Sequence, residues 1–187
     1  MDVPSLAEFR VAVDRIRNFR DSVLIKTIYL MAFRVNEVTL KVSPWKLLHG
    51  KTRPLGMYMK WEIRDYEGEK VFLVRAAVLK RKPKRKGESL VYKIVALPIN
   101  PVYEPWTIDL LKWIKQHGSL AFNLTDRRIL DIVKKHLSGL VPRMYTHLLR
   151  HFRVTHLIEY YKFDPVSYTH LRAHETEADL VCRLLLE

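Results

Sequence analysis

The chain has 187 residues and a formal net charge of +13, from 33 Lys and Arg against 20 Asp and Glu. A hydrophobic fraction of 48% allows one folded core and is unlike a disordered chain. The single cysteine, Cys182, excludes an internal disulfide, and no apolar stretch approaches the roughly 20 residues that span a bilayer. We therefore expect a cytoplasmic protein with no membrane-spanning segment, and its charge favours a polyanion, nucleic acid or an anionic lipid surface, as partner.

The first half of the sequence predicts helices followed by a small sheet. Ser5-Leu-Ala-Glu8 has the pattern of a capping box, so an amphipathic helix should begin near Leu6. An apolar stripe predicts a second helix, with Arg34 and Glu37 one turn apart at its far end. The stripe consists of Leu24, Ile28, Met31 and Val35. A period of two then predicts three antiparallel strands, at 57–63, 71–79 and 90–97, joined by turns at 65–68 and 80–87.

Helices return in the second half. Gly118 should end a helix that contains Leu110 to Ile114. Thr125 is the expected N-cap of a helix over 126–137, and a last helix should run from about 144 to 161. This order predicts the α+β class, as a mostly helical domain with a small three-stranded antiparallel sheet.

A dense group of cations occupies the turn of the second predicted hairpin. Its members are Lys80, Arg81, Lys82, Lys84, Arg85 and Lys86. A solvated loop is the plain interpretation, and a localisation signal is another. On a chain that is already strongly basic, such a loop is repelled by the rest of the protein and attracted only by a polyanion. The functional interpretation is therefore contact with DNA phosphates.

A second polar group stands on the last predicted helix. Helical spacing puts His147, Arg150 and His151 on one face, while neighbouring apolar residues turn to another. The two histidines have the spacing of a zinc motif, but Leu148 stands where H-E-x-x-H has its glutamate, and Arg150 would repel a dication. As core residues the histidines need no ligand, whereas Arg150 needs an anion. A phosphate meets that need, and we expect no metal or other cofactor.

Two segments of the sequence resemble the arginine boxes of the tyrosine recombinases, also called phage-type integrases. Leu30-Met-Ala-Phe-Arg34-Val-Asn-Glu37-Val resembles the first box, with Ala32-Phe33 in place of the usual Gly-Leu. His147-Leu-Leu-Arg150-His151-Phe-Arg-Val-Thr155-His156-Leu resembles the second, H-x-L-R-H-x-x-x-T-H-L. Between the boxes that family has a three-stranded sheet whose hairpin carries a lysine. The resemblance implies a catalytic domain at 1–164 without the separate DNA-clamping domain that most members have.

What the resemblance implies is site-specific DNA recombination, integration or excision, by strand breakage and rejoining through a 3′-phosphotyrosyl intermediate. The residues that it implies are Arg34, Lys80, His147 and Arg150 as catalytic, Glu37 and His151 in support, and Arg81, Lys82, Lys84, Arg85 and Lys86 on double-stranded DNA. The arginines would hold the two non-bridging phosphate oxygens, and the lysine would protonate the departing 5′ oxygen. Lys82 is the second choice for that lysine.

The nucleophile of that family has no clear counterpart here. Family members carry their tyrosine near the position of residues 181–183, where this sequence has none, and Tyr168 is the last tyrosine and a weak candidate. We therefore expect that this chain binds DNA without forming a covalent adduct, as a domain truncated before its nucleophile. From about Ser167 the tail at 165–187 is similar to translated sequencing-adapter DNA, with a genuine helix from Thr176 as the alternative.

Two other functions fit the same residues. One is a non-catalytic DNA-binding module, a decayed or regulatory integrase. The other is a type IB topoisomerase, although the H-x-L-R-H pattern fits recombinases better. The full-length parent of a recombinase domain is expected to form oligomers on DNA.

Overall fold

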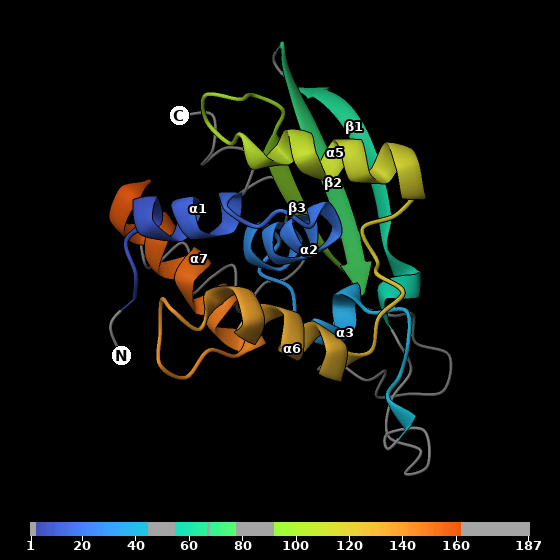
Figure 1. Cartoon of the computed structure of the whole chain (residues 1–187). Helices are drawn as coiled ribbons and strands as arrows, with labels where there is room; N and C mark the ends of the chain where they lie inside the picture. The colour runs from blue at the N-terminus through green and yellow to red at the C-terminus, as the bar shows by residue number, and fades with distance from the viewer. Residues whose placement is uncertain (1–2, 45–54, 67, 78–91, 162–187) are drawn as a thin grey trace.

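The structure is a computed structural model that describes residues 3–44, 55–66, 68–77 and 92–161. Its elements, in chain order, are α1 (Leu6–Asp14), α2 (Phe19–Leu30), α3 (Val35–Val38), the 3₁₀ helix η1 (Leu55–Tyr58), β1 (Lys60–Tyr66), β2 (Glu69–Ala77), β3 (Tyr92–Pro98), α5 (Trp106–His117), α6 (Asp126–Leu137) and α7 (Thr146–Tyr160). The strands form one antiparallel sheet in the order β1-β2-β3 (Figure 1). This confirms the predicted α+β class. In the described ranges no helix is long and apolar enough to cross a bilayer.

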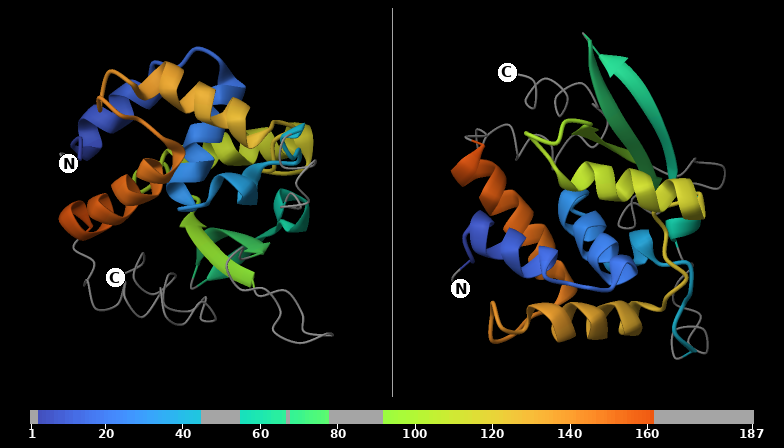
Figure 2. Two further views of the ribbon diagram at one scale, coloured as in Figure 1. Left: turned by 90° about the horizontal axis from the view of Figure 1, so that it is seen from below. Right: turned by 45° about the horizontal axis from the view of Figure 1, so that its top comes forward.

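Helix α2 is the centre of the fold. Every residue of α2 from Asp21 to Leu30 is buried, and the helix packs against α1, α5 and α7 (Figures 1 and 2). Phe9 of α1 is the aromatic centre of this packing, because its ring lies 4.7 Å from Tyr29 and 5.7 Å from Phe152 of α7. These contacts hold α7 against the last turns of α2. Arg34, the first candidate arginine, follows α2 in the chain.

Most helix ends lie where the sequence predicts them. The side chain of Ser5 accepts a hydrogen bond from the backbone of Glu8, and Glu8 accepts one in return, so the capping box of α1 is confirmed. Thr125 caps α6 by accepting from the N–H of Arg128 at 3.2 Å. Gly118 ends α5 with a φ of 75°, a backbone conformation that glycine adopts without strain.

The sheet differs from the prediction at its first strand. Residues 57 and 58, expected in that strand, belong to η1, and β1 begins only at Lys60. The cause is a close backbone approach at Gly56, where an added Cβ would lie 2.5 Å from the carbonyl oxygen of Thr39. β1 is an exposed edge strand, whereas β2 and β3 turn residues such as Phe72 and Leu97 into the core.

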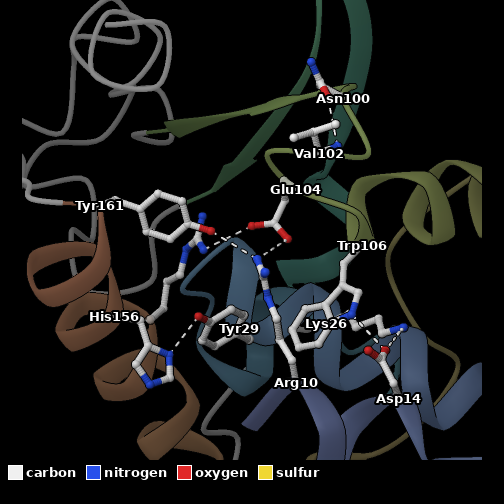
Figure 3. Close-up of polar contacts among 11 residues, drawn as sticks. Arg10, Asp14, Lys26, Tyr29, Asn100, Val102, Glu104, Trp106, His156 and Tyr161 are labelled. Atoms are coloured by element: carbon white, nitrogen blue, oxygen red, sulfur yellow. Dashed lines mark hydrogen bonds and ion pairs between the residues drawn. The ribbon is translucent and has the colours of Figure 1, made fainter. Parts of the chain in front are cut away.

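A buried ion network fixes α7 to the rest of the domain. Arg153 of α7 and Arg10 of α1 approach opposite oxygens of Glu104, at 3.4 and 3.5 Å (Figure 3). Arg10 also donates to the hydroxyl of Tyr161 at 3.1 Å. Because Arg153 and Glu104 are almost fully buried, they form a rigid support for the helix that carries the second arginine box.

The last histidine of that box, His156, is part of the core. Its Nε2 lies 2.8 Å from the carbonyl oxygen of Pro4, so Nε2 carries the hydrogen, and Nδ1 accepts from the hydroxyl of Tyr29 at 2.9 Å (Figure 3). Burial lowers the pKa of His156 below its ordinary value. His156 is therefore a neutral residue that ties α7 to α2 and to the N-terminal segment.

Candidate functional site

The candidate site begins where α2 stops. The sequence predicts one helix that includes Arg34 and Glu37 at its far end, but α2 ends at Leu30 and Arg34 is the N-cap of the separate helix α3. The N–H of Phe33 donates to the carbonyl of Ile28, and that of Ala32 to the carbonyl of Tyr29, both at 3.1 Å. These two bonds define a Schellman motif, which requires a left-handed residue after the C-cap. That residue is Ala32, with a φ of 47°.

Ala32 is strained, because a left-handed conformation costs an L residue with a Cβ about 1–2 kcal/mol. We expect Ala32→Gly to raise the free energy of unfolding by about 1 kcal/mol, and Tm by about 2–4 °C, as measured by thermal and urea unfolding. Ala7→Gly, at an exposed position of α1, is the matched control and should lower stability by about 1 kcal/mol. Equal losses in both variants would contradict the strain at Ala32.

Glu37 organises the residues that follow this turn. Its side chain is fully buried, and its Oε2 accepts from the backbone N–H of Arg34 at 2.8 Å. Its Oε1 lies 3.5 Å from Nη1 of Arg34 and forms no hydrogen bond. Glu37 therefore holds the start of α3 and the guanidinium of Arg34 together, while the side chain of Arg34 stays 24% exposed.

The structure adds Lys93 of β3 to this group. Its Nζ lies 2.7 Å from Oε2 of Glu37 and 4.5 Å from the ring centre of Phe33, and its side chain is only 15% exposed. On β3 it faces inward opposite the small residue Ala76 of β2. The sequence analysis did not identify Lys93, because the dense cations of the hairpin are the stronger signal for a phosphate-binding lysine. The signal was present, since a lysine stands in phase with the inward-facing Val95 and Leu97.

The ammonium of Lys93 is a stronger acid than that of an ordinary lysine. Burial lowers its pKa, the carboxylate of Glu37 opposes that effect, and the positive charges of Arg150 and Arg34 lower the pKa further. A lysine with a lowered pKa gives up a proton more readily near neutral pH. Arg34 of the first box and Lys93 share the carboxylate of Glu37.

Arg150 reaches the same place from α7. Its Nη1 donates to the carbonyl oxygen of Ala32 at 3.3 Å, across 118 positions of sequence. Within the described part of the chain Arg150 has no carboxylate partner. We call Arg34, Glu37, Lys93 and Arg150 the Glu37 cluster. Its three cations and one carboxylate carry a formal charge of +2, which leaves it short of anionic charge.

The two remaining residues of the second box are exposed on α7. The rings of His147 and His151 pack edge to face, with centres 4.7 Å apart. His147 lies one helical turn before Arg150 and so near the edge of the Glu37 cluster. In the described ranges no group of three or more histidine, cysteine or acidic side chains is placed to hold a metal ion.

Several predicted site residues lie outside the described ranges. They are the hairpin residues Lys80, Arg81, Lys82, Lys84, Arg85 and Lys86, and the weak nucleophile candidate Tyr168. The structure therefore brings together Arg34, Glu37 and Arg150 from the predicted set and adds Lys93. Comparison with family models, curated proteins and solved structures found no match to this chain.

Proposed function

We propose that this domain acts in site-specific DNA recombination, as a catalytic domain of the tyrosine recombinase kind, and that the Glu37 cluster binds the scissile phosphate. The observation that carries the proposal is the shortage of anionic charge in the cluster. Arg34 and Lys93 contact the single carboxylate of Glu37, and Arg150, which donates to the carbonyl of the nearby Ala32, has no carboxylate partner in the described ranges. A phosphodiester supplies the missing negative charge.

The turn before Arg34 supports the proposed relationship. In the tyrosine recombinases the first arginine box usually has Gly-Leu before the arginine, and this chain has Ala32-Phe33. Ala32 is left-handed, with a φ of 47°, so the position where the sequence departs from the family pattern is one where the backbone favours glycine. The resemblance thus extends to the left-handed backbone conformation at this position, which the alanine in the sequence does not indicate.

The arginines stabilise charge in the proposed reaction. Arg34 and Arg150 donate to the two non-bridging oxygens of the phosphate, and these bonds strengthen as the pentavalent transition state gains negative charge. Glu37 is a positioning residue, because its Oε2 holds both the backbone N–H of Arg34 and the ammonium of Lys93. His147 assists proton transfer from the attacking hydroxyl.

Lys93 is the proton donor in our proposal. An oxygen nucleophile forms a bond to phosphorus, the bond from phosphorus to the 5′ oxygen breaks, and the electron pair leaves on that oxygen. The oxygen takes a proton from the ammonium of Lys93, whose pKa burial has lowered. Lys80 and Lys82, the hairpin lysines that the resemblance implies, remain alternative predictions for this role.

The test supplies a nucleophile from solution, because in the described ranges no tyrosine hydroxyl forms a hydrogen bond with Arg34, Lys93 or Arg150. The probe is hydrogen peroxide, whose hydroperoxide anion is small and strongly nucleophilic. It is added with a metal chelator to a library of nicked duplexes of random sequence. New 5′-hydroxyl ends are then sequenced, and protein–DNA adducts are scored on a denaturing gel.

We expect peroxide-dependent 5′-hydroxyl ends at a preferred sequence and no covalent adduct. Binding of the duplexes with no cleavage at any sequence would contradict the proposal and indicate a DNA-binding module. An adduct that disappears in Tyr168→Phe would identify Tyr168 as the nucleophile and contradict the expectation that the chain forms none.

A further inference from the structure

A second basic site lies where α6 ends and the chain turns toward α7. An open depression of about 670 Å³ is lined there by Lys134, Lys135, Ser138, Pro142, Arg143, Met144 and Tyr145. Lys134, Lys135 and Arg143 are exposed, and in the described ranges none of them forms an ion pair with a carboxylate. Met144 is buried and forms the floor. We call this depression the α6–α7 groove.

The groove adjoins the start of α7, the helix that carries Arg150. Tyr145, on its rim, is the N-cap of α7 and stands two residues before His147. Figure 2 shows the connection between α6 and α7 ending where α7 begins, beside the central helix α2. The groove therefore lies at the N-terminal end of the helix whose Arg150 contacts Ala32, on the way to the Glu37 cluster along α7.

We infer that the α6–α7 groove holds backbone phosphates of duplex DNA next to the scissile phosphate; this inference rests on the proposed function. The cations of the groove are solvent-exposed and spread over a helix end and a loop, which suits several weak phosphate contacts. A small anion would need a buried, convergent site. The hydroxyls of Tyr145 and Ser138 add the neutral donors that commonly accompany such contacts.

The sequence analysis did not identify this groove because its cations are separated. Lys134 and Lys135 belong to the last turn of α6, where basic residues also suit the negative end of the helix dipole. Arg143 stands in the following loop, and only the fold places the three together. Removing these lysines therefore affects the helix end as well as the groove. The control variant must also remove a lysine from the last turn of a helix.

The test compares two triple variants of the whole chain. The groove variant is Lys134→Gln, Lys135→Gln and Arg143→Gln. The control is Lys70→Gln, Lys112→Gln and Lys115→Gln; all three lysines are exposed, and Lys115 lies in the last turn of α5. α5 lies at the opposite end of the domain from α6 (Figure 1). Both variants lose three charges from +13, so net charge alone affects them equally.

Affinity for a 30-base-pair duplex is measured by fluorescence anisotropy over a range of salt concentrations. The groove variant should lower the slope of log K against log salt by about 2–3, and affinity at about 0.1 M salt by about 10- to 100-fold, because each phosphate contact contributes about 0.9 to that slope. The control variant should lose much less of either. Vesicles of phosphatidylcholine with phosphatidylserine are a second probe, and the two variants should bind them equally well, because both have lost the same net charge.

The outcomes separate this inference from the proposed function. Equal losses in both variants, or an unchanged slope in the groove variant, would overturn the groove, and peroxide-dependent cleavage by the unmodified chain would still stand. Loss of vesicle binding in the groove variant with unchanged DNA binding would assign the groove to an anionic membrane surface. An unmodified chain that binds no DNA would overturn both.

Discussion

Glu37→Gln should be among the most destabilising single substitutions in this domain. It removes the one carboxylate of the Glu37 cluster and leaves Lys93 buried beside Arg34 and Arg150 without a counter-charge. Breaking a buried pair by removing one partner costs about 3–5 kcal/mol, which corresponds to about 6–20 °C in Tm for a chain of this size. Thermal and urea unfolding measure the loss.

The pH dependence of that loss has a definite sign. The pKa of Lys93 is below its ordinary value in the folded chain, so the unfolded chain binds more protons near that pKa. Stability therefore rises as pH increases toward the ordinary lysine range. In Glu37→Gln this rise should be larger, because the carboxylate that opposes deprotonation is gone, and part of the lost stability should return as pH rises toward the ordinary lysine range.

Two variants control this experiment. Glu62→Gln breaks a pair with Arg64 of similar length, 2.7 Å, but on the exposed strand β1, and should cost at most about 1 kcal/mol. Glu37→Gln combined with Lys93→Met should recover much of the stability, since it removes both charges. A Glu37→Gln variant no less stable than Glu62→Gln would show that the cluster does not depend on its carboxylate.

Arg150→Ala should have the largest effect on cleavage. Loss of one donor to the charge that develops in a transition state lowers a rate by about 10²–10³-fold, and Arg150 is the cluster cation with no carboxylate partner in the described ranges. The measurement is the rate of peroxide-dependent cleavage at saturating protein, so that weaker DNA binding does not contribute. Arg64→Ala removes an equal charge from the exposed edge of the sheet and is the control.

Arg150→Lys distinguishes geometry from charge. Lysine keeps the positive charge but does not donate in the forked, planar manner of a guanidinium. We expect it to recover DNA affinity more fully than the cleavage rate. Cleavage at an unchanged rate in Arg150→Ala would place Arg150 outside the reaction and reduce it to its contact with the carbonyl of Ala32.

Local patterns were enough to predict most of the fold. Ser5 with Glu8, Thr125 and Gly118 mark helix ends through short-range hydrogen bonds and backbone preference, which are properties of a few neighbouring residues. The end of α2 was missed because its left-handed residue is alanine, which gives no turn signal in sequence. The start of β1 was missed because Gly56 is fixed by the distant Thr39.

The candidate site was only partly predictable for a related reason. Arg34 and Arg150 stood out through the spacing of polar residues and through the two boxes. Lys93 acquires its significance from Glu37, 56 residues earlier in the chain, and no local pattern contains that pair. The groove cations Lys134 and Arg143 likewise meet only in the folded chain.

The most direct test of the Glu37 cluster as a strand-cleaving site replaces the 5′ oxygen of the preferred cleavage site with sulfur. A thiolate leaves without a proton donor, because a thiol has a far lower pKa than an alcohol. Lys93→Met should therefore cleave the oxygen substrate slowly and the sulfur substrate at the rate of the unmodified chain, while Arg150→Ala should be slow on both. Slow cleavage of both substrates by Lys93→Met, or sulfur rescue of Lys80→Met in its place, would contradict the account.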